Sequence, residues 1–308
     1  MQQVEHQSVV TDPSSDGCGG VHVYASPHDG EKPSVIPTQT LLGTLTTSCA
    51  AHSSSSAIVY RPQRMETTTT VIDSKGKPKE WKYIHLDATQ YISYADFWGH
   101  IQCFGASLEA HALVGQDCRV GIFADTRWEW ICSLYGMWTR SVVGVTVYST
   151  LDDDALAHAI TEAELSAICV SADKIERVLT IAAPTLRYVI CFDPLPQDIV
   201  IPGGVCLVSF HDMLWRDAPD VAAASAPPAR EVTQCPTLDD LSMIMYTSGT
   251  TGFPRGVMMT HHNLAMAVQS TRERIAAALA PKPRKGECYV AFLPLAHIFE
   301  LTAENLMF

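Results

Sequence analysis

A glycine- and hydroxyl-rich segment directly follows an apolar run in the last third of the chain. It extends from Thr247 to Val257 and contains three glycines and four hydroxyl residues. Glycine lets backbone N–H groups converge on an anion, hydroxyls add donors with little bulk, and Arg255 adds a permanent charge with a forked set of donors. Composition alone also suits a solvated turn, but the order and length of these residues favour a polyphosphate-binding loop. It is not a Walker A loop, because no Lys-Ser/Thr pair follows Gly256.

Histidines supply the other candidate chemistry. His297 and Glu300 are three positions apart at the start of a predicted helix and should share one of its faces. No third metal ligand is evident, and a Glu in a first helical turn is explained by the helix dipole alone. His261 and His262 directly precede Asn263, the expected N-cap of another helix, which predicts a capping or surface role for both.

The segment Tyr246–His261, YTSGTTGFPRGVMMTH, closely resembles the phosphate-loop signature YTSGTTGxPKGV of the adenylate-forming enzymes. Acyl-CoA synthetases, adenylation domains and luciferases share this signature. Val257–His261, Leu293–Leu301 and Thr126–Trp130 resemble the long-chain fatty-acyl-CoA synthetase branch in order and spacing, and the similarity covers about residues 91 to 308. Arg255 stands where that family has Lys, which keeps the charge but changes a point charge into a planar fork.

This resemblance implies ATP-dependent activation of long-chain fatty acids to acyl-CoA through an acyl-adenylate, catalysed by an AMP-forming long-chain fatty acid–CoA ligase. The implied cofactors are ATP, Mg²⁺ and CoA, and the implied partners are the fatty acid, ATP and CoA, with peripheral membrane contact and no nucleic acid. By the same resemblance Arg255 stabilises the pyrophosphate leaving group, His297 positions the acyl group or adenylate, and Thr251 places a hydroxyl near Mg²⁺. The expected nucleotide-binding residues are Tyr246, Thr247, Ser248, Gly249, Thr250, Thr251, Gly252, Pro254 and Gly256.

Later motifs of that family are not among these 308 residues: the YGxTE segment with its magnesium-binding Glu, the ribose-binding Asp and the C-terminal-domain Lys. We therefore expect an N-terminal portion of a longer enzyme that is not competent by itself. The alternative is a noncatalytic nucleotide-binding or regulatory module that kept the loop and lost the lysine-bearing lid. A third interpretation is a related ligase that acts on another carboxylate.

An α/β framework must position these residues. Short apolar runs alternate with amphipathic helices, which is typical of βαβ units and a largely parallel sheet. We expect part of the N-terminal domain of the adenylate-forming fold, with mixed or parallel sheets flanked by helices and incomplete at the C-terminus. The predicted strands are 118–124, 142–148, 167–170, 188–192, 241–246 and 288–293, and the predicted helices are 93–113, 128–138, 152–164, 173–183, 263–280 and one from His297.

The chain divides into a poorly ordered lead-in over residues 1–40 and a partial AMP-binding N-terminal domain over 41–308. Ser, Gly, Pro and Asp dominate the lead-in, which has no hydrophobic period. Inside the domain we expect a hairpin at 67–86, a βα region at 93–215, an Ala/Pro/Ser-rich linker at 217–237, and the phosphate loop with its following βα region at 240–308.

Composition excludes several classes of protein. The 308 residues include 21 basic and 33 acidic side chains, for a net charge of −12 and no long basic run, which argues against nucleic-acid binding. No run approaches the ~18 apolar residues of a membrane-spanning helix. The ten cysteines are widely spaced, form no CxxC motif, and several lie in apolar runs, so we expect small buried hydrophobes in a reducing compartment. The expected location is intracellular, in the cytoplasm or on the periphery of an organelle membrane.

Overall fold

The computed structural model of the chain describes residues 9–10, 24–25, 37–72, 74, 76–215, 235–247, 254–278 and 288–308. The chain forms two units, Met1–Pro37 and Thr38–Phe308. In the first unit, β1 (Val9–Val10) pairs antiparallel with β2 (Tyr24–Ala25). Most of the expected lead-in at 1–40 and of the expected linker at 217–237 lies outside the described residues.

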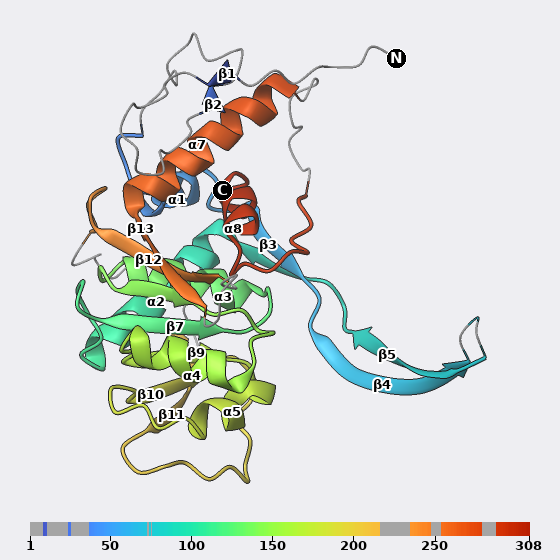
Figure 1. The fold of residues 1–308 in the computed structure, drawn as a ribbon. Coiled ribbons are helices and arrows are strands. Elements are labelled where there is room, and N and C mark those ends of the chain that lie inside the picture. The colour runs from blue at the N-terminus through green and yellow to red at the C-terminus, as the bar shows by residue number, and fades with distance from the viewer. Residues whose placement is uncertain are drawn as a thin grey trace. The chain divides into compact units, whose positions relative to one another are not determined.

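A seven-stranded sheet forms the centre of the second unit (Figure 1). Its strand order is β11-β10-β9-β7-β8-β12-β13, and every neighbouring pair is parallel except the antiparallel pair of β12 and β13. This arrangement confirms the α/β class expected from the alternating pattern. The strands are β7 (Arg119–Phe123), β8 (Val143–Thr146), β9 (Ala167–Val170), β10 (Tyr188–Cys191), β11 (Cys206–Ser209), β12 (Leu241–Thr247) and β13 (Arg255–Thr260).

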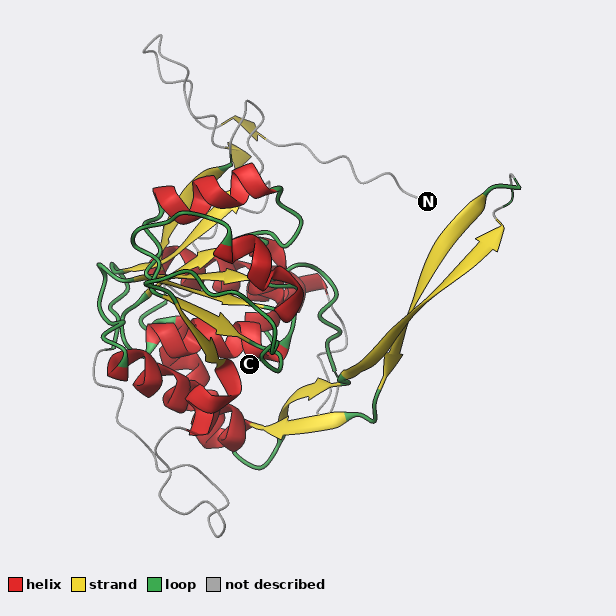
Figure 2. Ribbon diagram, turned by 90° about the horizontal axis from the view of Figure 1, so that it is seen from below, coloured by secondary structure: helices red, strands yellow, loops and turns green. Residues whose placement is uncertain are grey.

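Helices cover both faces of this sheet (Figure 2), and for that reason its inner strands are apolar without interruption. Successive residues of β12 show the two cores: Met243 and Met245 belong to the cluster that contains the α3 residue Trp130, while Ile244 and Tyr246 belong to the other. On the first face lie α2 (Tyr94–Ala110) and α3 (Trp128–Trp138), and on the second lie α4 (Asp153–Glu162) and α5 (Ile175–Leu179). The remaining helices are α1 (Leu41–Ala51), α6 (Phe210–Trp215), α7 (His261–Ala278), α8 (Ile298–Asn305) and the 3₁₀ turn η1 (Ala172–Lys174).

Local capping explains where several helices begin. Ser93 accepts a hydrogen bond from the backbone N–H of Asp96 at 3.1 Å, and its hydroxyl donates to the Asp96 carboxylate at 2.7 Å. Asp152 likewise accepts from the N–H of Ala155 at 2.9 Å. These contacts confirm the helix starts expected at 93 and 152, and α3 spans Trp128–Trp138 as predicted.

Three local expectations are wrong. Residues 288–293 form no strand: the segment pairs with neither edge strand of the described sheet, β11 or β13, and therefore lacks the ladder of hydrogen bonds that defines a strand. Helix α7 begins at His261, and its cap is Thr260 rather than Asn263: the Thr260 hydroxyl accepts from the Asn263 N–H at 3.2 Å. The helix expected at 173–183 shortens to η1 and α5, which ends at Leu179: its C-cap Thr180 donates a hydroxyl hydrogen bond to the Arg177 carbonyl at 2.8 Å. Pro184 disfavours helical geometry only at Ala183, the last expected residue.

A long two-stranded hairpin lies outside the main sheet (Figure 1). It is formed by β4 (Gln63–Ile72) and β5 (Pro78–Leu86), and it begins before the expected residue 67. Its base continues into the short antiparallel pair β3 (Ser56–Tyr60) and β6 (Gln90–Ser93). Every residue of both long strands is exposed except the half-buried Thr67.

No helix in the described part of the chain has the length and apolar character needed to cross a bilayer. The nine described cysteines are free thiols, and five of them are buried as expected of small hydrophobes. Cys206, Cys235 and Cys288 are instead exposed.

Candidate functional site

Strands β12 and β13 flank the loop that the sequence assigns to polyphosphate. Their register pairs Tyr246 with Gly256 and Thr247 with Arg255, so the loop leaves and re-enters the sheet at one point. That point is the carboxyl end of a parallel strand, the edge at which open α/β sheets bind ligands. The expected phosphate ligands Ser248, Gly249, Thr250, Thr251 and Gly252 lie outside the described residues.

The residues that close the loop differ in exposure. Arg255 is the first residue of β13 and is exposed, whereas Pro254 before it is buried. Across the ladder, the exposed Thr247 hydroxyl lies 3.5 Å from the Arg255 carbonyl oxygen, to which it donates. The side chain of Arg255 is thus at the surface beside the loop, where a permanent cation is available to an anionic ligand.

Tyr246 and Gly256 support the loop from the face of the sheet that α4 covers. Tyr246 is 2 % exposed, and its hydroxyl donates to Oε2 of Glu162 on α4 at 2.7 Å. Burial and this hydrogen bond raise the pKa of the Tyr246 phenol. A Cβ at Gly256 would lie 2.8 Å from Cγ2 of Ile244, so only glycine lets β13 approach β12 here. The buried Tyr246 ring and the absence of a side chain at Gly256 therefore both contribute to packing beneath the loop.

The opposite face of the β12–β13 pair packs against α3. The indole Nε1 of Trp138 donates to the Ser242 carbonyl at 2.9 Å, and the Ser242 hydroxyl donates to the Met259 carbonyl at 2.6 Å. The ring of His261 packs edge-on against Trp138, with centroids 5.1 Å apart. At 1 % exposure His261 is a core residue, which corrects the surface or capping role expected from sequence. Burial lowers its pKa to about 4, so the ring is neutral near pH 7.

The Thr126 hydroxyl joins two of the sequence motifs. It donates to the Leu293 carbonyl at 2.6 Å and accepts from the Leu295 N–H at 3.0 Å. The stretches 126–130 and 293–301, far apart in the sequence, are therefore brought together at the carboxyl end of β7. Both stretches are recognisable in the sequence, but no local pattern indicates this contact, because a threonine in a loop has many alternative partners.

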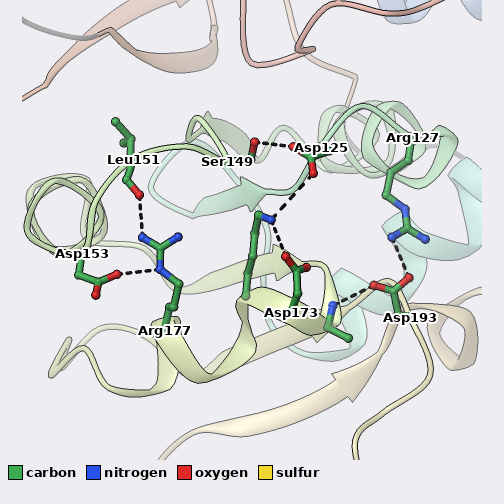
Figure 3. Close-up of polar contacts among 10 residues, drawn as sticks. Asp125, Arg127, Ser149, Leu151, Asp153, Asp173, Arg177 and Asp193 are labelled. Atoms are coloured by element: carbon green, nitrogen blue, oxygen red, sulfur yellow. Dashed lines mark hydrogen bonds and ion pairs between the residues drawn. The ribbon is translucent and has the colours of Figure 1, made fainter. Parts of the chain in front are cut away.

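Arg127 holds together the loops that follow β7, β9 and β10 (Figure 3). Its guanidinium donates to both carboxylate oxygens of Glu129 at 2.8 and 2.9 Å. It also donates to Oδ1 of Asp193 at 2.8 Å (Figure 3). The other Asp193 oxygen accepts from the Ala172 N–H at 2.8 Å. Burial alone would lower the pKa of Arg127, but the hydrogen bonds and charges of these carboxylates outweigh it and raise the pKa. Bidentate, charge-assisted pairs of this kind fix loop geometry.

Two further cations in the same view also have carboxylate partners. Lys174 Nζ lies 2.9 Å from Asp173 and 4.0 Å from Asp125, and Arg177 Nε lies 2.7 Å from Asp153 (Figure 3). Because their charges are balanced within the network, these side chains brace the carboxyl edge of the sheet. Sequence reasoning missed the network, since only the strand order brings its members together.

His297 and Glu300 do not act as a pair. His297 is exposed and caps α8, where its Nδ1 accepts from the Phe299 N–H at 3.1 Å. Glu300 is fully buried, and one of its oxygens accepts from the Tyr289 hydroxyl at 2.9 Å. Within the described ranges, no group of three His, Cys, Asp or Glu side chains is arranged to hold a metal ion.

A second buried carboxylate lies one turn along α8. Glu304 is 9 % exposed, and burial together with the charge of Glu300 raises its pKa to about 8. Burial and the hydrogen bond to Glu300 also raise the pKa of Tyr289 to about 12. The helix therefore carries a neutral Glu304 next to Glu300 at neutral pH.

Comparison with known proteins places this geometry in context. The sequence profile described as "AMP-binding enzyme" matches residues 72–308. Long chain acyl-CoA synthetase 8 of Arabidopsis thaliana is 29 % identical over 255 residues, which cover 81 % of this chain and 34 % of that protein. Long-chain-fatty-acid–CoA ligase 5 of Rattus norvegicus is 33 % identical over 225 residues, covering 71 % of this chain and 32 % of the ligase.

Among solved structures, the A-PCP didomain of carboxylic acid reductase from Segniliparus rugosus, in complex with AMP, superposes with a TM-score of 0.63. The two are 18 % identical, and the match covers 88 % of this chain and 38 % of the didomain. At that identity the likeness concerns the fold. The chain spans about a third of the length of the curated relatives it matches.

Proposed function

The chain belongs to the AMP-binding enzyme family, and from this premise we propose that it carries the phosphate-loop region of an AMP-forming long-chain fatty acid–CoA ligase. The observation that carries the proposal is the position of the two strand ends that flank the loop: Thr247 of β12 and Arg255 of β13 are paired at the carboxyl end of β12. The curated relatives are named as long-chain acyl-CoA synthetases and ligases, which supports the fatty-acid substrate class.

The proposed reaction has two halves. A fatty-acid carboxylate oxygen attacks the α-phosphorus of ATP, the bond to the pyrophosphate oxygen breaks, and acyl-AMP and pyrophosphate result. The CoA thiolate then attacks the acyl carbonyl carbon and displaces AMP. Neither half needs a covalent protein nucleophile, so the protein contributes alignment and stabilisation of charge on the phosphates.

The loop residues take the phosphate-binding role in this proposal. The backbone N–H groups and hydroxyls of residues 247–252 hold the β- and γ-phosphates, and Arg255 stabilises the charge that develops on pyrophosphate as it leaves. Tyr246 and Gly256 support the loop through packing, since Tyr246 is directed toward Glu162. Magnesium would add a Lewis acid on the phosphate oxygens, and Thr251, the expected nearby hydroxyl, stays a prediction.

His297 is proposed to position the acyl group or adenylate. Its Nδ1 accepts the Phe299 N–H, so the neutral ring carries its proton on Nε2. That Nε2–H is available as a donor from an exposed side chain. A donor of fixed direction at the start of α8 suits a carboxylate or phosphate oxygen.

The test joins residues 1–308 to the C-terminal remainder of the rat relative and measures release of pyrophosphate with palmitate, acetate and benzoate in turn. We expect release that depends on ATP and palmitate, and no acyl-CoA from residues 1–308 alone. Preference for benzoate or acetate would instead assign another carboxylate to the enzyme.

A direct binding measurement covers the case in which the fusion does not fold. Calorimetry of residues 1–308 with ATP and with a non-hydrolysable palmitoyl-adenylate analogue reports on the loop without turnover. Binding of the analogue that depends on Arg255 supports the proposal. ATP binding with no contribution from the acyl chain, together with an inactive but folded fusion, would favour a noncatalytic nucleotide-binding module.

A further inference from the structure

The β4–β5 hairpin has two faces of different chemistry. Side chains alternate along each strand, and residues paired across an antiparallel ladder point to the same side. The register pairs Thr69 with Trp81, Thr67 with Tyr83 and Val71 with Lys79. We call the side that these residues share the aromatic face; its members are Met65, Thr67, Thr69, Val71, Lys79, Trp81, Tyr83 and His85.

The aromatic face presents large apolar groups to water. Trp81 is 50 % exposed, Tyr83 is 47 % exposed and Met65 is 48 % exposed. A large exposed apolar patch is unusual on a protein surface and marks an interaction site. An isolated two-stranded hairpin is also at best marginally stable in water, so it would gain stability from a partner. The face therefore suits a partner that removes the rings from water.

Charge is distributed unequally between the two faces. The aromatic face contains no carboxylate; its cation is Lys79, whose Nζ lies 5.9 Å from the centroid of the Trp81 ring. Both acidic residues of the strands, Glu66 and Glu80, point to the other side, where Glu66 pairs with Lys82 at 2.8 Å. The aromatic face can thus approach a negatively charged surface without repulsion from carboxylates on that face.

The hairpin is also basic within an acidic protein. Residues 63–86 contain five Lys and Arg and three Asp and Glu, a net charge of +2, while the whole chain carries −12. Of the lysines on the described strands, Lys79 lies on the aromatic face beside Trp81, whereas Lys82 lies on the other side with Glu66. Trp and Tyr side chains next to Lys are typical of protein segments that lie at the boundary between lipid headgroups and acyl chains.

We propose that the aromatic face of the β4–β5 hairpin docks on an anionic phospholipid bilayer, with Trp81 and Tyr83 at the headgroup boundary and Lys79 on an anionic headgroup. The phosphates of a nucleic acid could pair with Lys79, but they would leave the aliphatic side chains of Met65 and Val71 in water. A second copy of the same face would cover the rings but offer Lys79 no carboxylate partner, because the face contains none. A bilayer offers the headgroup boundary to the rings, acyl chains to the aliphatic groups and anionic headgroups to Lys79. This proposal stands independently of the catalytic one.

The test is flotation of the 308-residue chain with vesicles of phosphatidylcholine alone or with about 30 % phosphatidylserine, whose surface potential attracts basic segments. We expect preferential binding to the anionic vesicles, weakened at about 0.5 M salt. The double variant Trp81→Ala/Tyr83→Ala should lower the partition coefficient at least about tenfold through lost apolar burial. Lys79→Gln should lower it about fivefold.

Matched controls come from exposed residues elsewhere in the second unit. Tyr91→Ala removes a ring that is 67 % exposed on β6, and Arg272→Gln removes an exposed charge on α7. Both should bind vesicles as the unchanged chain does. Trp81→Phe keeps an aromatic ring and should keep most binding, but it should lose the fluorescence quenching that brominated lipids cause through Trp81.

Three results would overturn the proposal. Equal binding to neutral and anionic vesicles would remove the role of charge, and full binding by the double variant would remove the role of the rings. If the double variant instead converts a dimer into a monomer in sedimentation and leaves vesicle binding unchanged, the aromatic face is a contact between copies of the chain. Thermal unfolding of each variant, followed by circular dichroism, shows that the main sheet is intact.

Discussion

Thr126 and Leu295 are 169 positions apart in the sequence, yet the hydroxyl oxygen of Thr126 lies 3.0 Å from the backbone nitrogen of Leu295 and accepts its hydrogen bond. The same hydroxyl donates to the carbonyl of Leu293 at 2.6 Å. One small side chain thus fixes the segment that leads into His297 and α8 to the carboxyl end of β7. Because Leu295 is 1 % exposed, its N–H has little access to water as an alternative partner.

Thr126→Val should destabilise the protein by about 1–3 kcal/mol, because it removes both hydrogen bonds while keeping the side-chain shape. Hydrogen exchange of the Leu295 amide should accelerate more than that of amides in β9. Thr180→Val is the matched control, since the exposed Thr180 hydroxyl bonds only within its own helical turn. An unchanged Leu295 exchange rate in Thr126→Val would contradict the role given to this hydroxyl.

Tyr246→Phe should cost about 1 kcal/mol, since it removes one hydrogen bond to the half-exposed Glu162 but keeps the buried ring. Tyr246→Ala should cost about 3–5 kcal/mol through the cavity it leaves. Denaturant unfolding measures both. If Tyr246 only supports the loop, the phenylalanine variant binds ATP within about twofold of the unchanged chain, a change of less than ~0.5 kcal/mol. A large loss of ATP affinity with little loss of stability would place the phenol in contact with the nucleotide.

Arg255→Ala, made in the fusion described above, should lower pyrophosphate formation about 10²–10³-fold, the usual effect of removing one donor to a developing charge. The KM for palmitate should change little, because the interaction strengthens only as the phosphates leave. Arg255→Lys should restore most of the rate by restoring the charge. Equal rates for all three proteins would show that Arg255 makes no contact with the leaving phosphates.

Stability should fall as pH rises from about 4.5 to 8 because of Glu304. Its pKa of about 8 lies above the ordinary value of 4.5, so in this window the native state holds a proton that the unfolded state has released. The loss amounts to about 3 kcal/mol by pH 7. Glu304→Gln should stabilise the protein at pH 7 to 8 and flatten this part of the profile in urea unfolding. A slope that persists in Glu304→Gln would assign the effect to other groups.

His261 should produce the opposite slope in acid. Its pKa of about 4 lies below the ordinary 6.5 because the ring is buried, so the unfolded state takes up a proton before the native state does. Stability contributed by the neutral ring is therefore lost as pH falls from about 6.5 toward 4. His261→Leu should remove this acid sensitivity, whereas His262→Leu at the half-buried neighbouring position should leave it in place.

The sequence by itself determined the framework and the kind of site. Helix starts at Ser93 and Asp152 follow from caps that lie within one turn of the residues they bind, and short apolar strands between amphipathic helices define a sheet that is covered on both faces. The order of glycines, hydroxyls and Arg255 after an apolar strand predicts a phosphate-binding loop without tertiary information. These signals are local, so the chain carries them before it folds.

Only the tertiary structure decided what several of those residues contact. Tyr246 lies in a phosphate-loop motif, but its hydroxyl bonds to Glu162, 84 positions earlier. Arg127 meets Asp193 because β7, β9 and β10 are adjacent in the sheet, an order that no local pattern encodes. The apolar run 288–293 has the composition of a strand but forms none, since a strand exists only where a neighbour supplies its hydrogen bonds. Long-range partners of this kind are set by strand order and packing, which depend on the whole chain at once.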